Sequence, residues 1–97
     1  MSRNCKLNCT VKAGMFANEY MASVKAIGSD GLSQKDVHLF VDKNCLENVH
    51  VNKSCKGKAQ LRAVETGKTK SGVAVVLPQP TIENGPSVLV PRAILVK

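Results

Sequence analysis

The chain has 97 residues, of which 43% are hydrophobic, and its 14 lysines and arginines against seven acidic residues give a net charge of +7. This length supports one modest core, so we expect a single small domain over residues 1–97 and not a multidomain enzyme. The longest apolar run, residues 73–77, is far shorter than the roughly twenty residues of a membrane-spanning helix. Residues 1–6 are basic but lack the apolar segment of a secretory signal, so we expect a cytoplasmic protein.

The first predicted element is a strand at residues 5–13. From residue 7 to residue 13 the odd-numbered side chains are apolar (Leu7, Cys9, Val11, Ala13), whereas the even-numbered side chains between them are polar. A period of two is typical of a strand with one buried face.

Residues 14–28 fit two structures. Phe16, Tyr20, Val24 and Ile27 share one face of a helix that could end at Gly28. The same segment alternates from residue 20 to residue 26 and is followed by turn-forming residues 28–31. We favour a strand at about residues 20–27, with a short helix within residues 15–27 as the alternative.

The middle of the chain predicts further strands with a turn between them. Alternation indicates strands at residues 37–41 and 59–64, and another extended segment begins at Val49. We expect a turn or one short helical turn at residues 43–48, and a basic loop at residues 53–58.

The last third of the chain predicts loops and edge strands. Residues 66–72 read as a loop before the extended run at residues 73–77. The Asn84-Gly85 pair favours a tight hairpin turn. Proline cannot donate to a sheet ladder, so this end should hold edge strands and turns. The four prolines are Pro78, Pro80, Pro86 and Pro91.

Six short extended runs joined by glycine and proline turns predict an all-β fold, a small barrel of five or six antiparallel strands of the SH3-like or OB-like kind. Residues 88–96 carry a strand, Pro91, a tight turn and a last short strand at residues 93–96. This order resembles the closing segment of SH3-like barrels. The resemblance implies a fold and no function, because the aromatic residues with which SH3 domains grip proline-rich peptides have no counterpart here.

The four cysteines are expected to be reduced structural thiols, ahead of disulfides or a metal site. Cys5 and Cys9 lie four residues apart on a predicted strand, so their Cα atoms would be about 13 Å apart. That separation exceeds the reach of a disulfide or of one zinc ion. Cys45 and Cys55 are spaced too widely for a zinc knuckle.

The sequence predicts no catalytic centre, cofactor or small-molecule substrate. His38 and His50 alternate with apolar residues and are expected on the solvent side of strands. Residues 67–69 resemble the end of a phosphate-binding loop, but Arg62 stands where that motif requires glycine. We therefore expect a protein that is not an enzyme.

Basic residues cluster in one stretch, residues 53–70, where Glu65 is the only acid. Such a cluster attracts phosphate backbones through counterion release. Because stacking aromatics are scarce, duplex or structured RNA, or an acidic protein surface, fits better than bare single strands. The candidate anion-binding residues are Lys53, Lys56, Lys58, Arg62, Lys68 and Lys70.

Two function classes follow. The leading hypothesis is a non-enzymatic binding module that contacts nucleic acid or another acidic surface through these residues. The alternative is a structural or assembly protein that self-associates through exposed strand edges or its surface. A basic surface that only keeps the protein soluble would explain the same composition.

Overall fold

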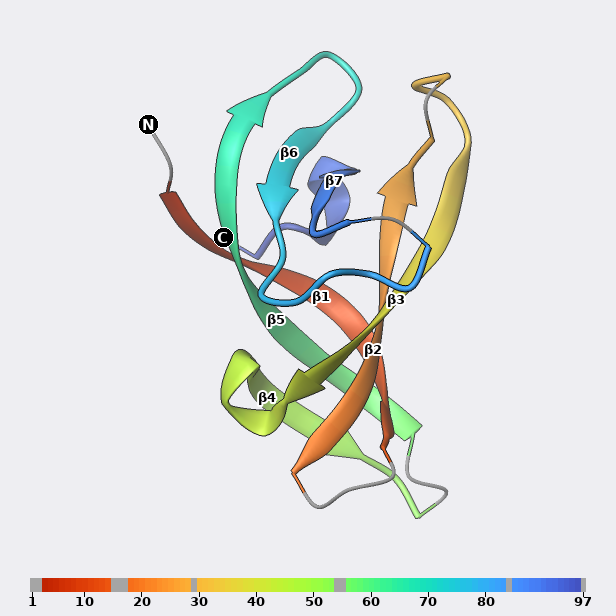
Figure 1. Cartoon of the computed structure of the whole chain (residues 1–97), viewed down its shortest axis with the longest axis vertical. Helices are drawn as coiled ribbons and strands as arrows, with labels where there is room; N and C mark the ends of the chain where they lie inside the picture. Colours follow the sequence, from red (N-terminus) through yellow and green to blue (C-terminus); the bar gives the residue numbers. More distant parts are fainter. Residues whose placement is uncertain (1–2, 15–17, 29, 54–55, 84, 97) are drawn as a thin grey trace.

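The computed structural model describes residues 3–14, 18–28, 30–53, 56–83 and 85–96, which build one curled antiparallel sheet (Figure 1). The described residues contain seven strands, one more than the upper limit predicted from the sequence. They are β1 (Arg3–Ala13), β2 (Glu19–Ile27), β3 (Gln34–Asp42), β4 (Leu46–Val51), β5 (Lys56–Lys68), β6 (Val73–Val76) and β7 (Ser87–Val90). Two short 3₁₀ turns, η1 (Lys43–Cys45) and η2 (Arg92–Ile94), complete the fold. The all-β prediction is confirmed.

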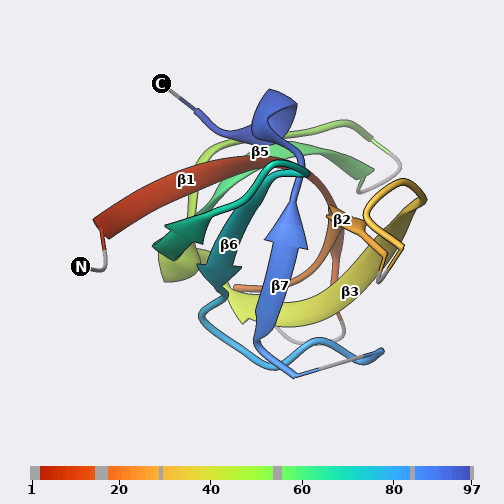
Figure 2. The same cartoon turned by 90° about the horizontal axis from the view of Figure 1, so that it is seen from above.

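The strands follow the order β3-β2-β1-β5-β6-β7, and β4 also pairs with β5. The longest ladder joins β1 to β5, from the pair Arg3–Glu65 to the pair Lys12–Lys56. The other edge of β5 pairs first with β4 and then with β6. Strand twist curls this sheet into a half-barrel, seen from above in Figure 2.

The core fills the inside of the half-barrel. Leu61 of β5 is fully buried and lies directly between Leu7 of β1 and Leu46 of β4. The alternation predicted for β1 is confirmed at Leu7, Cys9 and Val11, which are buried. Ala13 is exposed instead, because it lies one residue beyond the last pair of the β1–β5 ladder.

The favoured strand at residues 20–27 is confirmed as β2, and residues 18–27 contain no helix. Ala22, Val24 and Ala26 point inward, and Val24 lies opposite Val37 of β3. Pairing on both edges, with β1 and β3, stabilises the extended form. Residues 15–17, which include Phe16 of the helical alternative, lie outside the described residues.

The loops predicted at residues 53–58 and 66–72 are shorter than expected, because β5 continues from Lys56 to Lys68. Ladder bonds from β1, β4 and β6 hold this long strand extended despite its lysines and glycines. A bulge between Glu65 and Gly67 shifts its register before the turn at residues 69–72. The turn predicted at residues 43–48 is confirmed as η1 for residues 43–45, whereas residues 46–48 already belong to β4, because this strand pairs with β5.

The segment between β6 and β7 covers the open edge of β3 (Figure 2). Residues 77–86 join these paired strands, so the connection is much longer than the predicted tight hairpin turn, and Asn84 lies outside the described residues. Within it, the Ile82 N–H donates to the carbonyl oxygen of His38 at 2.7 Å. This contact blocks part of a strand edge that would otherwise be free to pair.

The end of the chain crosses back over β1. After β7 come Pro91 and η2, and Leu95 then forms a single bridge with Leu7. The strand predicted at residues 93–96 is therefore reduced to a 3₁₀ turn and one bridge. No helix within the described residues is long and apolar enough to cross a bilayer.

Candidate anion-binding face

The structure spreads the six predicted basic residues along the length of β5 and the loops at its two ends. Lys56, Lys58 and Arg62 are exposed and alternate along the outer face of β5, opposite in direction to the buried Ala59 and Leu61. Lys53 lies just before this strand, beyond β4.

Lys68 and Lys70 lie at the other end of β5. Twelve residues of extended chain separate Lys68 from Lys56, a path of about 40 Å. Lys68 also lies opposite the buried Val73, and cross-strand partners point to the same side of the sheet. Its side chain therefore points away from the side that carries Lys56 and Lys58. Lys70 belongs to the turn that follows. The structure thus places Lys53, Lys56 and Lys58 toward one end of β5, Arg62 midway along it, and Lys68 and Lys70 at the other end.

The neighbouring strand adds a lysine that the charge cluster in the sequence did not include. Lys12 of β1 is the direct cross-strand partner of Lys56, and Thr10 is the partner of Lys58. Side chains in such pairs have Cβ atoms about 5 Å apart and point to the same side of the sheet. Lys12, Lys56 and Lys58, which we call the basic face, are all exposed. None of the three forms an ion pair within the described part of the chain.

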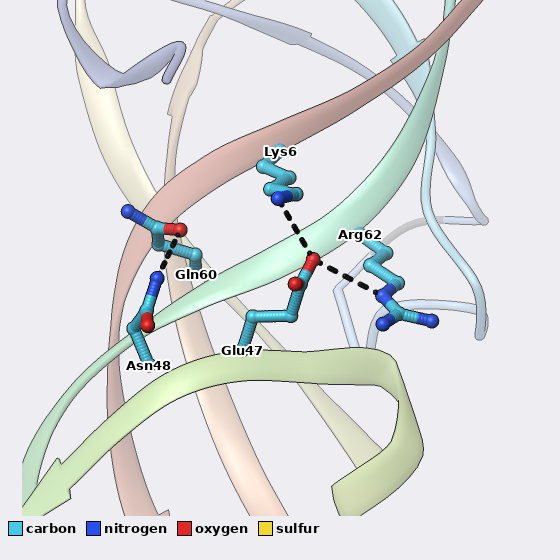
Figure 3. Close-up of polar contacts among 5 residues, drawn as sticks. All are labelled: Lys6, Glu47, Asn48, Gln60 and Arg62. Atoms are coloured by element: carbon cyan, nitrogen blue, oxygen red, sulfur yellow. Dashed lines mark hydrogen bonds and ion pairs between the residues drawn. The ribbon is translucent and has the colours of Figure 1, made fainter. Parts of the chain in front are cut away.

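A second basic pair lies on the same ladder but shares one carboxylate as its counterion (Figure 3). Lys6 of β1 is the cross-strand partner of Arg62. Glu47 of β4 reaches between them, and its Oε2 lies 3.0 Å from Lys6 Nζ and 3.3 Å from Arg62 Nε. The hydrogen bond from Lys6 is the main reason that the pKa of Glu47 is lowered, and Arg62 adds to it. Arg62 is therefore engaged within the fold.

Arg92 is another cation with an internal partner. Its guanidinium group donates to the carbonyl oxygens of Thr69 and Lys70, which ties η2 to the turn after β5. This fixes the position of the Lys70 backbone and assigns Arg92 a structural role.

One of the two histidines adjoins the basic face. His38 is half-buried and bonded to Glu83, whereas His50 is exposed as the β4 partner of Lys58. Cys5, Cys9 and Cys45 are free thiols, and Cys55 lies outside the described residues. Among the residues described, no three His, Cys, Asp or Glu side chains are placed to hold a metal ion.

An open pocket of about 590 Å³ adjoins the basic face where β1 and β2 separate. Its lining includes Lys58 and the polar residues Asn8, Thr10 and Ser23. Lys25 and Asp36 also line it and form an ion pair of 3.3 Å. The pocket therefore combines polar groups, and a lysine without an ion pair among the described residues, with the apolar Ala59 and Ile94.

Comparisons with protein-family models, with curated proteins and with solved structures gave no match to this chain. Function must therefore be inferred from the arrangement of the side chains themselves.

Proposed function

We propose that this protein is a non-enzymatic binding module that contacts nucleic acid, a polyanion, through Lys12, Lys56 and Lys58. The observation that carries the proposal is the direct opposition of Lys12 and Lys56 across the β1–β5 ladder, with Lys58 two residues further along. Like charges in this position destabilise a sheet, and a phosphate group between them removes the repulsion.

The pair formed by Lys6 and Arg62 supports this reading by contrast. It has the same cross-strand geometry, but Glu47 supplies the negative charge. At Lys12 and Lys56 the described residues offer no such carboxylate. An external anion can take the position that Glu47 occupies in the other pair.

The test compares two double variants with the same change in net charge. Lys56→Gln with Lys58→Gln removes part of the basic face, and Lys68→Gln with Lys70→Gln removes two lysines at the far end of β5. Both should fold normally, since exposed substitutions change stability by less than about 0.5 kcal/mol. Binding of a labelled RNA hairpin is followed by fluorescence anisotropy over a salt series.

We expect the first double variant to lose about tenfold or more in affinity and the second to lose much less. Contact of three lysines with phosphates predicts a log–log salt slope of about −2.7 for the unmodified protein. Equal losses in both double variants would reduce the binding to overall charge and overturn the proposal. Binding of polyglutamate in preference to the hairpin would overturn it in favour of an acidic protein partner.

Two finer predictions belong to the same proposal. An SH3-like affiliation of the half-barrel is supported by the order of β7, Pro91 and η2, followed by the bridge at Leu95. The second finer prediction is that the protein is located in the cytoplasm, as expected from its sequence.

A second candidate function is self-assembly through a strand edge. Among the described residues, β4 pairs only with β5, so the other edge of Leu46–Val51 has no partner strand. Val51 on this strand is 38% exposed. Light scattering over a concentration series tests the idea. A molar mass that rises with the concentration of the unmodified protein, and that is lower in Val51→Lys at the same concentration, would support assembly. A monomer at every concentration would exclude it.

A further inference from the structure

An exposed aromatic side chain shares the outer surface with the basic face. Phe40 of β3 is 49% exposed, because the neighbouring Leu39 and Val41 take the buried side of the strand. From the sequence alone, side chains on which bases could stack were counted as scarce. The structure places Phe40 outside the core.

The strand register aligns Phe40 with two of the lysines. Phe40 is the cross-strand partner of Met21, Met21 is the partner of Lys12, and Lys12 is the partner of Lys56. These four residues form one row across β3, β2, β1 and β5, which lie side by side in this order (Figure 1). Neighbouring strands are about 4.8 Å apart, so the backbone at Phe40 is about 10 Å from that at Lys12 and about 14 Å from that at Lys56.

We propose that this row binds single-stranded nucleic acid, with one base stacked on Phe40 and the phosphates of neighbouring nucleotides at Lys12 and Lys56. The inference rests on the proposed function and names its substrate class. Aromatic side chains beside a basic track are how proteins hold unpaired bases, since every base has a face that can stack. In a duplex these faces are buried in the base stack, so a duplex could contact the lysines but could not stack a base on Phe40.

The surroundings of the row favour one direction for the bound strand. Glu19 and Asp42 face each other in the next position along β2 and β3, on the side of the β1–β2 turn. Their carboxylates repel phosphates on that side. On the other side lie Ser23, Thr10 and Lys58, which line the open pocket beside the basic face. We therefore expect the strand to leave the row toward that pocket.

The experiment uses labelled ten-nucleotide oligouridylate and oligothymidylate, with a blunt duplex of the same length for comparison. We expect the unmodified protein to bind the single strands about tenfold more tightly than the duplex. Phe40→Leu keeps an apolar side chain but removes the ring, and its affinity should fall by about fivefold or more, the lower limit of one lost base stack. Leu32→Ala, at a site that is 88% exposed in the β2–β3 turn, is the matched control and should bind normally.

A spectroscopic readout separates stacking from a structural role of Phe40. The chain contains no tryptophan, so Phe40→Trp introduces a single reporter. Its fluorescence should be quenched when oligothymidylate binds, and the affinity of this variant should equal or exceed that of the unmodified protein. This variant also keeps the test open if Phe40→Leu fails to fold.

The outcomes distinguish the inference from the proposed function. Normal binding by Phe40→Leu, unquenched tryptophan fluorescence in Phe40→Trp or equal affinity for the duplex would overturn the single-strand assignment. If Lys56→Gln with Lys58→Gln still lost affinity in such a case, the basic face would stand as a phosphate-binding site. If that double variant also bound normally, both proposals would fail. A preference for oligouridylate over oligothymidylate would support the assignment and identify RNA as its form.

Discussion

The carboxylate of Glu83 accepts two hydrogen bonds from His38, one from the ring nitrogen Nδ1 at 2.6 Å and one from the backbone N–H at 2.8 Å. The two residues are 45 positions apart in the sequence. Together with the bond from Ile82 to the His38 carbonyl oxygen, they fasten Ile82 and Glu83 to the edge of β3. The Glu83 side chain thus occupies the N–H of His38, and the Ile82 N–H occupies its carbonyl oxygen, so neither is open to another strand.

This pair predicts that the protein loses stability in acid. The bond from the His38 ring, followed by that from its N–H, lowers the pKa of Glu83. A lowered pKa adds stability above the ordinary pKa of glutamate, and that stability is lost as the pH falls through the lowered value. Urea unfolding over a pH series should find Glu83→Gln less stable than the unmodified protein at about pH 7, with a difference that shrinks as the pH falls below the ordinary pKa of glutamate. A difference that does not change with pH would contradict this.

Glu47 predicts an opposite effect of one substitution on stability and on binding. In Glu47→Gln the cross-strand pair Lys6–Arg62 loses its carboxylate, so the two cations repel each other. Stability should fall at low salt and recover at high salt, since ions screen exposed charges. Polyanion binding should tighten by a few-fold, because the outer surface becomes more positive near the basic face.

The control for Glu47 is Glu65→Gln, which changes the net charge equally on the neighbouring strand β5. Glu65 lies beside Lys68, away from the basic face. Anisotropy with the same RNA hairpin should detect a smaller gain for Glu65→Gln than for Glu47→Gln. Equal gains would mean that net charge alone decides the affinity.

The strands with regular alternation could be predicted from the sequence, because their pattern depends only on which side faces the core. This holds for β1 and β3, whose buried residues match the predicted faces except at Ala13. The length of β5 could not be predicted, since its first residues are held by β1 and β4 against their loop-like composition. Hydrogen bonds to strands distant in the sequence determine that this segment is a strand and not a loop.

The candidate site was predictable only in part for the same reason. The charge cluster identified Lys56 and Lys58, but Lys12 joins them through a strand register that one sequence does not reveal. Arg62 was included among the candidate anion-binding residues because the sequence does not reveal its counterion. That counterion is Glu47 of β4, a strand whose pairing with β5 is shifted by a bulge between Glu47 and His50. Asn48, with a φ of 52°, lies inside that bulge and leaves no signal that a period of two would detect.

Cys9 predicts a thiol that reacts slowly in the native protein. Its Sγ donates to the Ala59 carbonyl oxygen at 3.5 Å, and burial raises its pKa to about 11 from an ordinary value of 9.0. At about pH 8 only about one thiol in a thousand is then ionised, and the thiolate is the reactive form. The raised pKa also means that stability declines as the pH rises from about 9 toward 11.

Timed alkylation followed by peptide mass spectrometry checks the prediction for Cys9. Cys5 serves as the internal comparison, because it lies on the same strand and is only half-buried. Cys5 should be modified first, and Cys9 should react at a comparable rate only after unfolding in urea. If Cys9 reacted as fast in the native protein as in the unfolded chain, the buried side of strands β1 and β5 would be accessible to the reagent, which would contradict the prediction.

Gly57 predicts the most damaging single substitution near the basic face. It lies on β5 opposite Val51, where the backbones approach so closely that a Cβ atom would overlap the His50 carbonyl oxygen and lie 2.7 Å from the Val51 Cα atom. Gly57→Ala must therefore push β4 away from β5, which we expect to cost about 1–3 kcal/mol of unfolding free energy.

Gly67→Ala on the same strand is the matched control, because a Cβ atom there meets nothing within 4 Å. Urea unfolding should find Gly67→Ala as stable as the unmodified protein or slightly more stable, since alanine restricts the unfolded chain. Equal stability of the two variants would mean that β4 can shift freely, and the contact of Glu47 with Arg62 would then lose its fixed geometry.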